Sequence, residues 1–286
     1  MPSDTWLRYA FAVATTAVLL ILFHVVQRLF SPRHTLKADA QGRNLAYLMV
    51  QAGHTGAVLM LVPGVVQEAL GHDTLAGSVL WAAAFLAAGV LLIQLVGELG
   101  IRLLLRATLR HELESGNVAA GVSAAANYVA VGILAAPAIA GSDLQGLGLA
   151  LAFFGLAVAT HAAYVALFRS LTVYDDSEQI QGENLAAALS YAGLSVAVAV
   201  VLARALTGGE FVGWGPALRG YGTVAASALA LYPVRQLIVQ GLVLGRAPTL
   251  RGGALDQAIG AERNTAMAML EALAYLATAV ALVQLT

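Results

Sequence analysis

Long runs of apolar residues, separated by short polar segments, make up nearly the whole chain. About 20 residues at a rise of 1.5 Å cross a hydrocarbon core roughly 30 Å thick, so each run predicts a membrane-spanning helix. The eight runs are Leu7–Phe30, Asn44–Leu70, Leu75–Leu105, Asn117–Ala140, Leu147–Leu171, Asn184–Leu206, Ala217–Leu244 and Asn264–Leu285. Because these runs are continuous rather than alternating, they exclude a transmembrane β-barrel. The pattern predicts an all-α polytopic membrane protein, with kinks or breaks at Pro63, Pro137 and Pro233.

Composition agrees with this class and removes several others. Of the 286 residues, 59% are hydrophobic and 11% are charged, whereas a soluble domain carries about 25% charged residues. The lipid bilayer is therefore the expected surrounding. The formal net charge of −1 provides no basic surface for nucleic acid. The chain contains no cysteine, which excludes disulfides and thiolate metal sites.

The placement of Lys and Arg predicts the orientation of the helices. Positive charges collect in the cytoplasmic loops of membrane proteins. Most of the 15 cations fall in the loops after the odd-numbered runs or at the adjoining helix ends: Arg28, Arg33, Lys37, Arg43, Arg102, Arg106, Arg110, Arg169, Arg246, Arg251 and Arg263. We therefore expect four short cytoplasmic loops and both termini in the periplasm.

Four of the predicted helices begin with the same short pattern. Asn44, Asn117, Asn184 and Asn264 each start an Asn-x-Ala string, at spacings of 73, 67 and 80 residues. An Asn side chain at this position accepts a backbone N–H from the first helical turn, so the four residues are predicted helix caps. Recurrence at the same topological position indicates an internal duplication.

Other residues recur in both halves of the chain. Gln94-x-x-x-Glu98 in the third run corresponds to Gln236-x-x-x-Gln240 in the seventh, and His24 in the first to His161 in the fifth. A unit with an even number of spans keeps its orientation when repeated. We therefore predict two parallel four-helix repeats, over residues 1–141 and 142–286.

The capping strings also carry a family resemblance. The string Glu114-Ser115-Gly116-Asn117-Val118-Ala119-Ala120 resembles the pattern of the bacterial membrane family called domain of unknown function 350, which includes YjfL-like proteins. The resemblance implies tandem copies of a four-span unit and a location in the bacterial inner membrane. It implies no reaction, cofactor or catalytic residue. The second copy departs from the pattern, since Glu183 and Arg263 stand where Gly116 precedes Asn117.

A few ionisable residues lie at membrane depth, all in the predicted cytoplasmic half or near the midplane. Such groups cost about 2.5 kcal/mol or more at the bilayer centre, so each requires a partner or a purpose. The candidates for a polar cavity are His24, His54, Glu98, His161, Arg235 and Glu271. Histidine suits proton exchange because its ordinary pKa is near 6.5.

A structural interpretation of the same residues is also open. Arg235 would pair with Glu98 or Glu271, and Glu98 would pair with Arg102, which lies four residues further along the same helix. Asn127 and the glutamines of the third and seventh runs would then bridge helices by hydrogen bonds.

The motifs of catalysis and metal binding are missing from the sequence. No His-x-x-x-His or Glu-x-x-His string occurs, so no metal or other cofactor is expected. The loops are too short for a catalytic domain and no nucleophile–base pair is evident, so we do not expect an enzyme.

We expect instead a channel-like or transporter-like protein with a cytoplasm-facing polar cavity for protons, cations or small solutes. The alternative is a non-conducting scaffold or envelope-stress partner that recruits cytoplasmic proteins through its basic loops and its acidic loop at Asp175–Glu183. Small residues in the helices would also permit a homo-oligomer.

Overall fold

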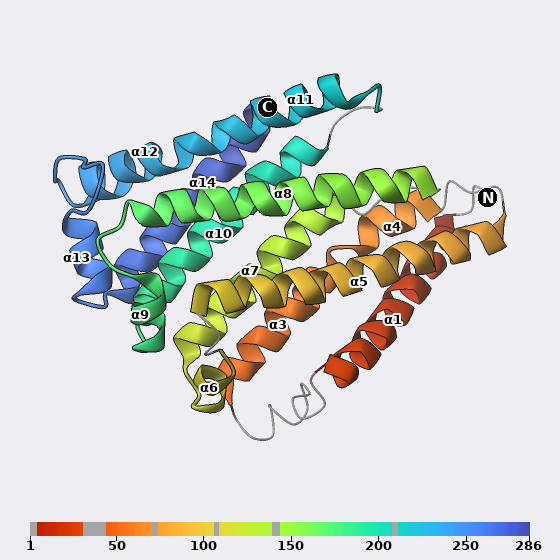
Figure 1. Cartoon of the computed structure of the whole chain (residues 1–286), viewed down its shortest axis with the longest axis horizontal. Coiled ribbons are helices and arrows are strands. Elements are labelled where there is room, and N and C mark those ends of the chain that lie inside the picture. Colours follow the sequence, from red (N-terminus) through yellow and green to blue (C-terminus); the bar gives the residue numbers. More distant parts are fainter. Residues whose placement is uncertain (1–4, 31–43, 70–73, 106–108, 139–143, 208–210) are drawn as a thin grey trace.

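A computed structural model describes residues 5–30, 44–69, 74–105, 109–138, 144–207 and 211–286. Throughout these ranges the chain is built from helices joined by turns and short loops (Figure 1). The elements are α1 (Thr5–Phe30), α3 (Leu45–Leu59), α4 (Val62–Ala69), α5 (Leu75–Leu105), α6 (Leu109–Glu114), α7 (Val118–Ala138), α8 (Leu144–Ser170), α9 (Asp176–Gln181), α10 (Leu185–Leu206), α11 (Trp214–Ser227), η1 (Ala228–Ala230), α12 (Leu231–Arg235), η2 (Gln236–Val243), α13 (Ala254–Gly260) and α14 (Thr265–Leu285).

Within the described ranges, eight segments are long and apolar enough to cross a membrane. This confirms the all-helical fold class and the eight predicted spans. The repeat boundary predicted between residues 141 and 142 falls outside the described residues, as do the predicted run ends at Leu70 and Ala140 and the cations Arg33, Lys37, Arg43 and Arg106.

Two spans are interrupted near the prolines that the sequence singles out. The second span consists of α3 and α4, separated by a turn just before Pro63. The seventh span passes from α11 through the 3-10 turn η1 into α12, which contains Pro233, and then into the π-helix η2. Proline lacks a backbone N–H and cannot continue regular α-helical hydrogen bonding. Pro137, in contrast, lies in the last turn of α7.

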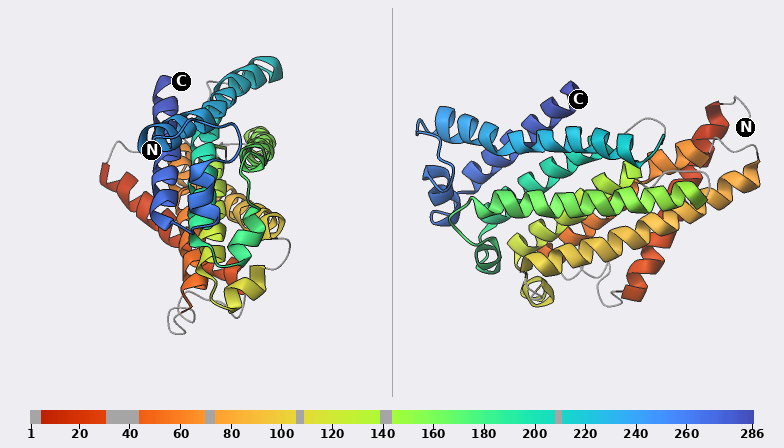
Figure 2. Two further views of the ribbon diagram at one scale, coloured as in Figure 1. Left: turned by 90° about the vertical axis from the view of Figure 1, so that its left-hand side faces the viewer. Right: turned by 45° about the horizontal axis from the view of Figure 1, so that its top comes forward.

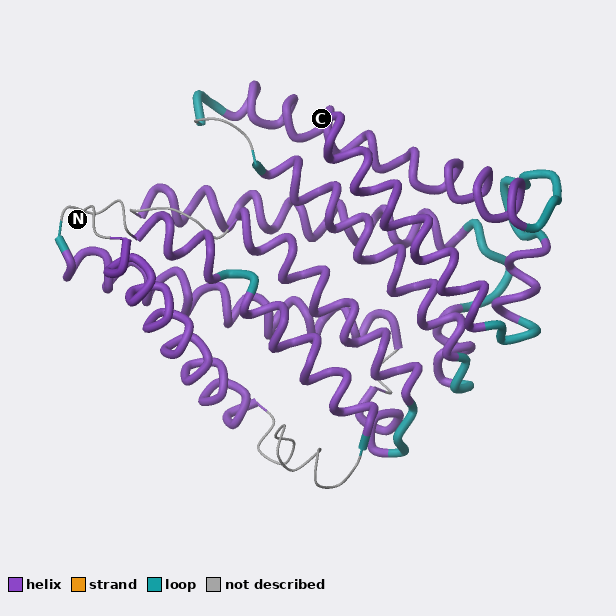
Figure 3. Tube along the Cα trace, turned by 180° about the vertical axis from the view of Figure 1, so that it is seen from behind, coloured by secondary structure: helices purple, strands orange, loops and turns teal. Residues whose placement is uncertain are grey.

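The four helices that begin with a capping Asn form a row. In this row α3 packs on α7, α7 on α10, and α10 on α14 (Figures 1 and 3). In Figure 1, α5 crosses in front of α3 and α7, and α8 in front of α7 and α10. The second view in Figure 2 shows the second half, α8 to α14, on one side of the molecule and α1 to α7 on the other.

Small residues bring the helices of the row close together at equivalent positions in both repeats. A Cβ atom added to Gly53 on α3 would lie 2.5 Å from Ala125 Cα on α7. A Cβ atom added to Gly193 on α10 would lie 2.4 Å from Ala272 Cα on α14. Both glycines are nine residues after a capping Asn, and both alanines are eight residues after the next. The two repeats therefore share the same close helix packing.

All four predicted Asn caps are present. The Oδ1 atom of Asn44 accepts from Tyr47 N at 3.2 Å, and that of Asn264 accepts from Met267 N at 3.1 Å. Asn117 and Asn184 act in the same way on the first turns of α7 and α10. These contacts satisfy backbone donors that a helix leaves free at its start.

The amide groups of the first three caps also tie neighbouring helices together. Asn44 Nδ2 donates to the carbonyl oxygen of Leu113 at 2.8 Å, in the short helix α6 that precedes Asn117. Asn117 donates to Ile180 on α9 at 2.8 Å and Asn184 to Ile259 on α13 at 2.9 Å, each in the short helix that precedes the next cap. The repeated Asn thus joins each helix of the row to the next, a role beyond capping.

The residue before the cap explains the glycine in the sequence pattern. Gly116 has a φ of 85°, in the left-handed region. Glu183 and Arg263 occupy the same place in the later loops with φ values of 59° and 53°. A side chain in this region costs about 1–2 kcal/mol per residue. The second repeat therefore keeps the backbone turn although it lacks the glycine.

Candidate functional site

A group of buried charges lies at the end of the second repeat where α14 begins. Arg235 at the end of α12 donates from Nε to Glu271 Oε1 on α14 at 2.6 Å. Its Nη2 atom contacts the same Glu271 oxygen and lies 3.3 Å from Asp256 Oδ1 on α13. The side chains of all three residues are 0% exposed or nearly so. We call these three residues the Arg235 cluster.

The irregular seventh span positions this cluster. After Pro233 the chain enters η2, where Leu244 N donates to Val239 O over five residues rather than four. The wider turn places Gln236 and Gln240 on the buried side of the segment, with exposed fractions of 3% and 1%. Short π-helical segments often occur at functional sites because they change which residues face inward.

Several buried polar atoms of these residues lack partners among the described residues. They are Arg235 Nη1, Glu271 Oε2, Gln236 Oε1 and Gln240 Oε1. Three of the four are oxygen atoms that can accept a hydrogen bond or bind a cation. Buried polar groups in folded proteins are normally satisfied, so four exceptions within the Arg235 cluster and the adjoining η2 segment require an explanation.

The loop between η2 and α13 closes over the cluster. Gln240 Nε2 donates to Ala247 O at 2.8 Å and to Thr249 Oγ1 at 2.9 Å. The Tyr232 hydroxyl donates to Leu250 O at 3.0 Å. Asp256 Oδ2 accepts from Val173 N at 2.9 Å, which ties α13 to the loop after α8.

A second ion pair lies nearby in the same half. Arg169 at the end of α8 pairs with Asp176 on α9 and donates to Ser190 Oγ at 2.9 Å. The guanidinium group also lies 5.2 Å from the centre of the Tyr174 ring. Burial raises the pKa of the Asp176 carboxyl, and this effect outweighs the opposing attraction of Arg169. Burial likewise raises the pKa of Tyr174.

The other candidates for the predicted cavity lie in separate surroundings. Glu98 pairs with Arg102 along α5, with exposed side-chain fractions of 36% and 63%. His161 on α8 is buried, with Nε2 3.0 Å from Ser195 O on α10. His24 is exposed on α1.

His54 lies in an aromatic setting. Its ring stacks on Tyr128 with a centroid separation of 4.3 Å and meets Phe23 edge-on at 4.6 Å. Its Nε2 atom has no partner among the described residues. The structure thus brings Arg235 and Glu271 together, and places Glu98, His24, His54 and His161 apart from them.

The sequence did not point to Asp256, because only charges inside the apolar runs were candidates for the cavity. Asp256 lies between the seventh and eighth runs, on a short helix that folds back onto the membrane-spanning helices. Of the alternatives that the sequence left open, the structure shows Arg235 with Glu271 and Glu98 with Arg102. It also shows Asn127 donating to Gly97 O on α5 at 2.8 Å, a bridge between helices.

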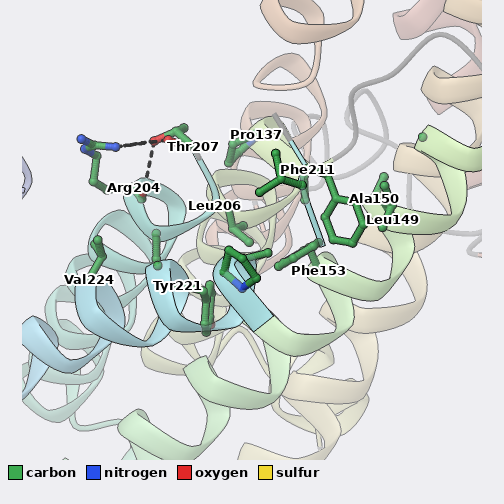
Figure 4. A pocket seen from close by; sticks show the side chains of 17 residues that line it. Pro137, Leu149, Ala150, Phe153, Arg204, Leu206, Thr207, Phe211, Tyr221 and Val224 are labelled. Atoms are coloured by element: carbon green, nitrogen blue, oxygen red, sulfur yellow. Dashed lines mark hydrogen bonds between the residues drawn. The ribbon is translucent and has the colours of Figure 1, made fainter. Parts of the chain in front are cut away.

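The described part of the chain also contains cavities away from the Arg235 cluster. One, of about 510 Å³, lies at the opposite end of the second repeat and is lined by aromatic and apolar side chains with Arg204 at its edge (Figure 4). Another, of about 380 Å³, lies between α5, α7 and α8 and reaches Arg169 and Asp176. Within the described ranges, no group of three or more His, Asp or Glu side chains is arranged to hold a metal ion.

Comparison with known proteins gives a family and no function. The model of the family Domain of Unknown Function (DUF350) matches residues 1–139 and again residues 142–285. These two matches confirm the tandem copies that the capping strings predict. No curated protein and no solved structure matches the chain.

Proposed function

The chain belongs to the DUF350 family in both of its halves, and on this premise we propose that it is a channel-like or transporter-like protein in which the Arg235 cluster takes up protons or small cations. The observation that carries the proposal is a fully buried ion pair in which Glu271 Oε2 has no partner among the described residues, next to a segment, η2, with two further unpartnered glutamine oxygens. No chemical reaction is needed for this role, so we do not propose an enzyme.

The charges of the cluster favour an additional positive charge. One guanidinium group faces two carboxylates, those of Glu271 and Asp256. When all three side chains are ionised, the buried group carries an excess negative charge. An excess charge in a low-dielectric interior is costly, and a bound proton or cation lowers that cost.

The neighbouring acceptors match the same ligand. Glu271 Oε2, Gln236 Oε1 and Gln240 Oε1 are hard oxygen atoms without a donor in the described part of the chain. Oxygen atoms of carboxylate and amide groups are the preferred ligands of hard cations, and they also accept hydrogen bonds from a hydrated proton. An anionic substrate would meet repulsion from both carboxylates.

The position of the cluster suits entry from one side of the membrane. Glu271 lies seven residues after Asn264, about 10 Å along the helix at 1.5 Å per residue. The distribution of Lys and Arg supports a cytoplasmic location for this end, in a bacterial inner membrane, with both termini in the periplasm. Segment 244–253 and α13 then form the cytoplasmic cover of the cluster.

Flux into liposomes containing the purified protein tests this proposal. Proton flux is followed with an enclosed pH-sensitive dye, and Na⁺ and K⁺ flux with cation-sensitive dyes. We expect the wild-type protein to exceed protein-free liposomes at least tenfold for one of these ions. The combined variant Arg235→Ile, Asp256→Asn, Glu271→Ala should reduce that flux to the protein-free level.

The combined variant removes all three charges, so that no unpaired buried charge is left to unfold the protein. Glu178→Gln, on the exposed surface of α9, is the matched control and should keep the wild-type rate. Size-exclusion profiles confirm that each protein is folded. Wild-type flux in the combined variant would overturn the proposal. Absence of flux through the folded wild-type protein would also overturn it, and would favour a non-conducting scaffold with cytoplasmic partners.

A further inference from the structure

The row of capped helices has an open face at each end. On α14 the outward residues include Leu273 and Val280, which are 60% and 56% exposed. On α3 they are Leu45, 46% exposed, Ala52, which is also exposed, and Leu59, 37% exposed. Although α1 packs against α3 and α4, it leaves these three residues of α3 uncovered.

The equivalent positions inside the row are covered. Leu273 is nine residues after its capping Asn, and the residue at this position on α7 is Ala126, which is 7% exposed. Leu59 is fifteen residues after its cap, and the residue at this position on α10 is Ala199, which is fully buried. Since α7 and α10 pack on each other, the faces exposed at the ends are the faces that join the two repeats.

We propose that a second copy of this chain continues the row, with α14 of one copy packed against α3 of the next. The interaction surface consists of the exposed Ala266, Leu273 and Ala277 on α14 and, on α3, of the exposed Ala52 and Leu59 with the half-buried Leu48. The partner is another copy because the chain already contains the equivalent contact. Within the chain, α10, the equivalent of α3, packs in parallel on α7, the equivalent of α14.

The register of this interface follows from the contacts within the first repeat. There α3 meets α7 through three close pairs, Ala46 with Gly121, Gly53 with Ala125, and Ala57 with Gly132. Counted from the capping Asn of each helix, the three α3 residues are at positions 2, 9 and 13, and their partners on α7 are at positions 4, 8 and 15.

We transfer the α3 positions to α14 and the α7 positions to α3 of the second copy. This gives three pairs of side chains of complementary size. They are Ala266 with Leu48, Leu273 with Ala52, and Ala277 with Leu59. Each pair joins a small side chain with a large one, which allows two helix surfaces to interdigitate. Paired leucines at these places would hold the helices apart, and none of the three pairs contains two leucines.

Direction and capping agree with this arrangement. The helices α3, α7, α10 and α14 begin at the same end of the molecule (Figures 1 and 3), so a second copy inserted in the same orientation presents α3 parallel to α14. The inner caps Asn117 and Asn184 are 1% and 0% exposed beneath the next loop, whereas Asn264 is exposed. The start of α14 is therefore open where a further helix would lie.

The proposed contact joins two different faces, so it repeats head to tail and generates a closed ring or an extending row. A two-fold dimer would instead bring α14 against α14 or α3 against α3. This difference makes the proposal testable by the positions that cross-link.

Cysteine cross-linking in membranes tests the interface directly, because the natural chain contains no cysteine. Leu273→Cys and Ala52→Cys are placed on two full-length chains with different tags, which are expressed together and treated with an oxidant and a short thiol cross-linker. We expect a covalent dimer that carries both tags. A single chain that carries both substitutions should form a ladder of higher oligomers.

Two controls define the specificity. Ala126→Cys with Ala192→Cys in one chain should close an internal bridge between α7 and α10, since these alanines occupy the same register positions. Leu273→Cys with Leu151→Cys, which is 43% exposed on α8, should give no dimer above background.

Three outcomes would overturn the proposal. Cross-linking of Leu273→Cys or Ala52→Cys chains with themselves would show a two-fold contact. An absence of dimers while the internal bridge closes would show that lipid covers the end faces. Failure of the internal bridge would show that the transferred register is wrong.

Discussion

At two buried positions the second half of this protein carries charged side chains where the first half carries apolar ones. Counted from the recurring glutamines Gln94 and Gln236, Arg235 corresponds to Ile93. Counted from the caps, Glu271 corresponds to Ala124. Ile93 and Ala124 are fully buried, as are Arg235 and Glu271. The first half thus fills with apolar groups the place where the second half holds an ion pair.

The halves nevertheless share the features that hold the row together. Both use Asn caps, the same amide bridge to the next loop and the same glycine–alanine contacts. The packing of the row therefore does not require buried charge. Because desolvating an ion pair costs several kcal/mol per ion, a pair at two positions that are apolar in the first half is evidence of a role other than holding the fold, which supports the proposed ion site.

The largest expected effect comes from breaking the buried pair. Glu271→Ala alone leaves Arg235 with only the longer contact to Asp256, and we expect a loss of about 3–5 kcal/mol in the free energy of unfolding. The combined variant Arg235→Ile, Asp256→Asn, Glu271→Ala introduces the first half's residues at positions 235 and 271, removes the charge at position 256, and should recover most of this loss. Thermal and denaturant unfolding in detergent measure both. A combined variant as unstable as the single one would show that the second half needs its charges to fold.

A smaller effect tests what the halves share. Gly53→Ala and Gly193→Ala each force a Cβ atom against the backbone of the next helix, at 2.5 Å and 2.4 Å from the nearest Cα atoms. We expect each to lower stability by about 1–3 kcal/mol through overpacking. Gly56→Ala is the control, because a Cβ atom there meets nothing within 4 Å. Unequal losses at the two glycines would show that the repeats do not pack alike.

The turns before the caps provide a contrast of about 1 kcal/mol. Gly116→Ala places a side chain in the left-handed region and should destabilise the first half by this amount. Arg263→Gly relieves the same conformation in the second half, at a φ of 53°. Glycine also gains freedom in the unfolded chain, which offsets part of this gain in stability, so we expect the substitution to be neutral or stabilising. The same unfolding measurements apply. Destabilisation by Arg263→Gly would indicate that the arginine side chain is itself needed.

The sequence predicts local features of this fold well. The apolar runs, the four Asn caps and the Glu98–Arg102 pair all depend on spacing along one helix, which the sequence contains directly. The amide bridges from each Asn to the next loop depend on which helices are neighbours, and spacing alone does not specify this.

The candidate site shows the same limit. The sequence marks Arg235 and Glu271 as costly buried charges but leaves two partners open for Arg235, because helix rotation and packing decide between them. The sequence does not identify Asp256 as a member of the cluster, because its short helix lies outside the apolar runs and reaches the cluster only after folding. The π-helical turn that aims Gln236 and Gln240 inward follows from tertiary packing, since Pro233 predicts a distortion without its form.

The smallest expected effect concerns the exposed ion pair of the first half. Glu98→Gln removes the partner of Arg102, but both side chains lie at the molecular surface near the expected cytoplasmic end of α5, where we expect water to screen their attraction. We expect a loss of about 0.3–0.5 kcal/mol, measured by unfolding, which shrinks further at high salt. Glu271→Gln makes the identical chemical change at a buried position and should cost several times more, with little dependence on salt. If the two substitutions cost the same, Glu98 also lies in a dry polar environment in the membrane, and both halves would contain an ion site.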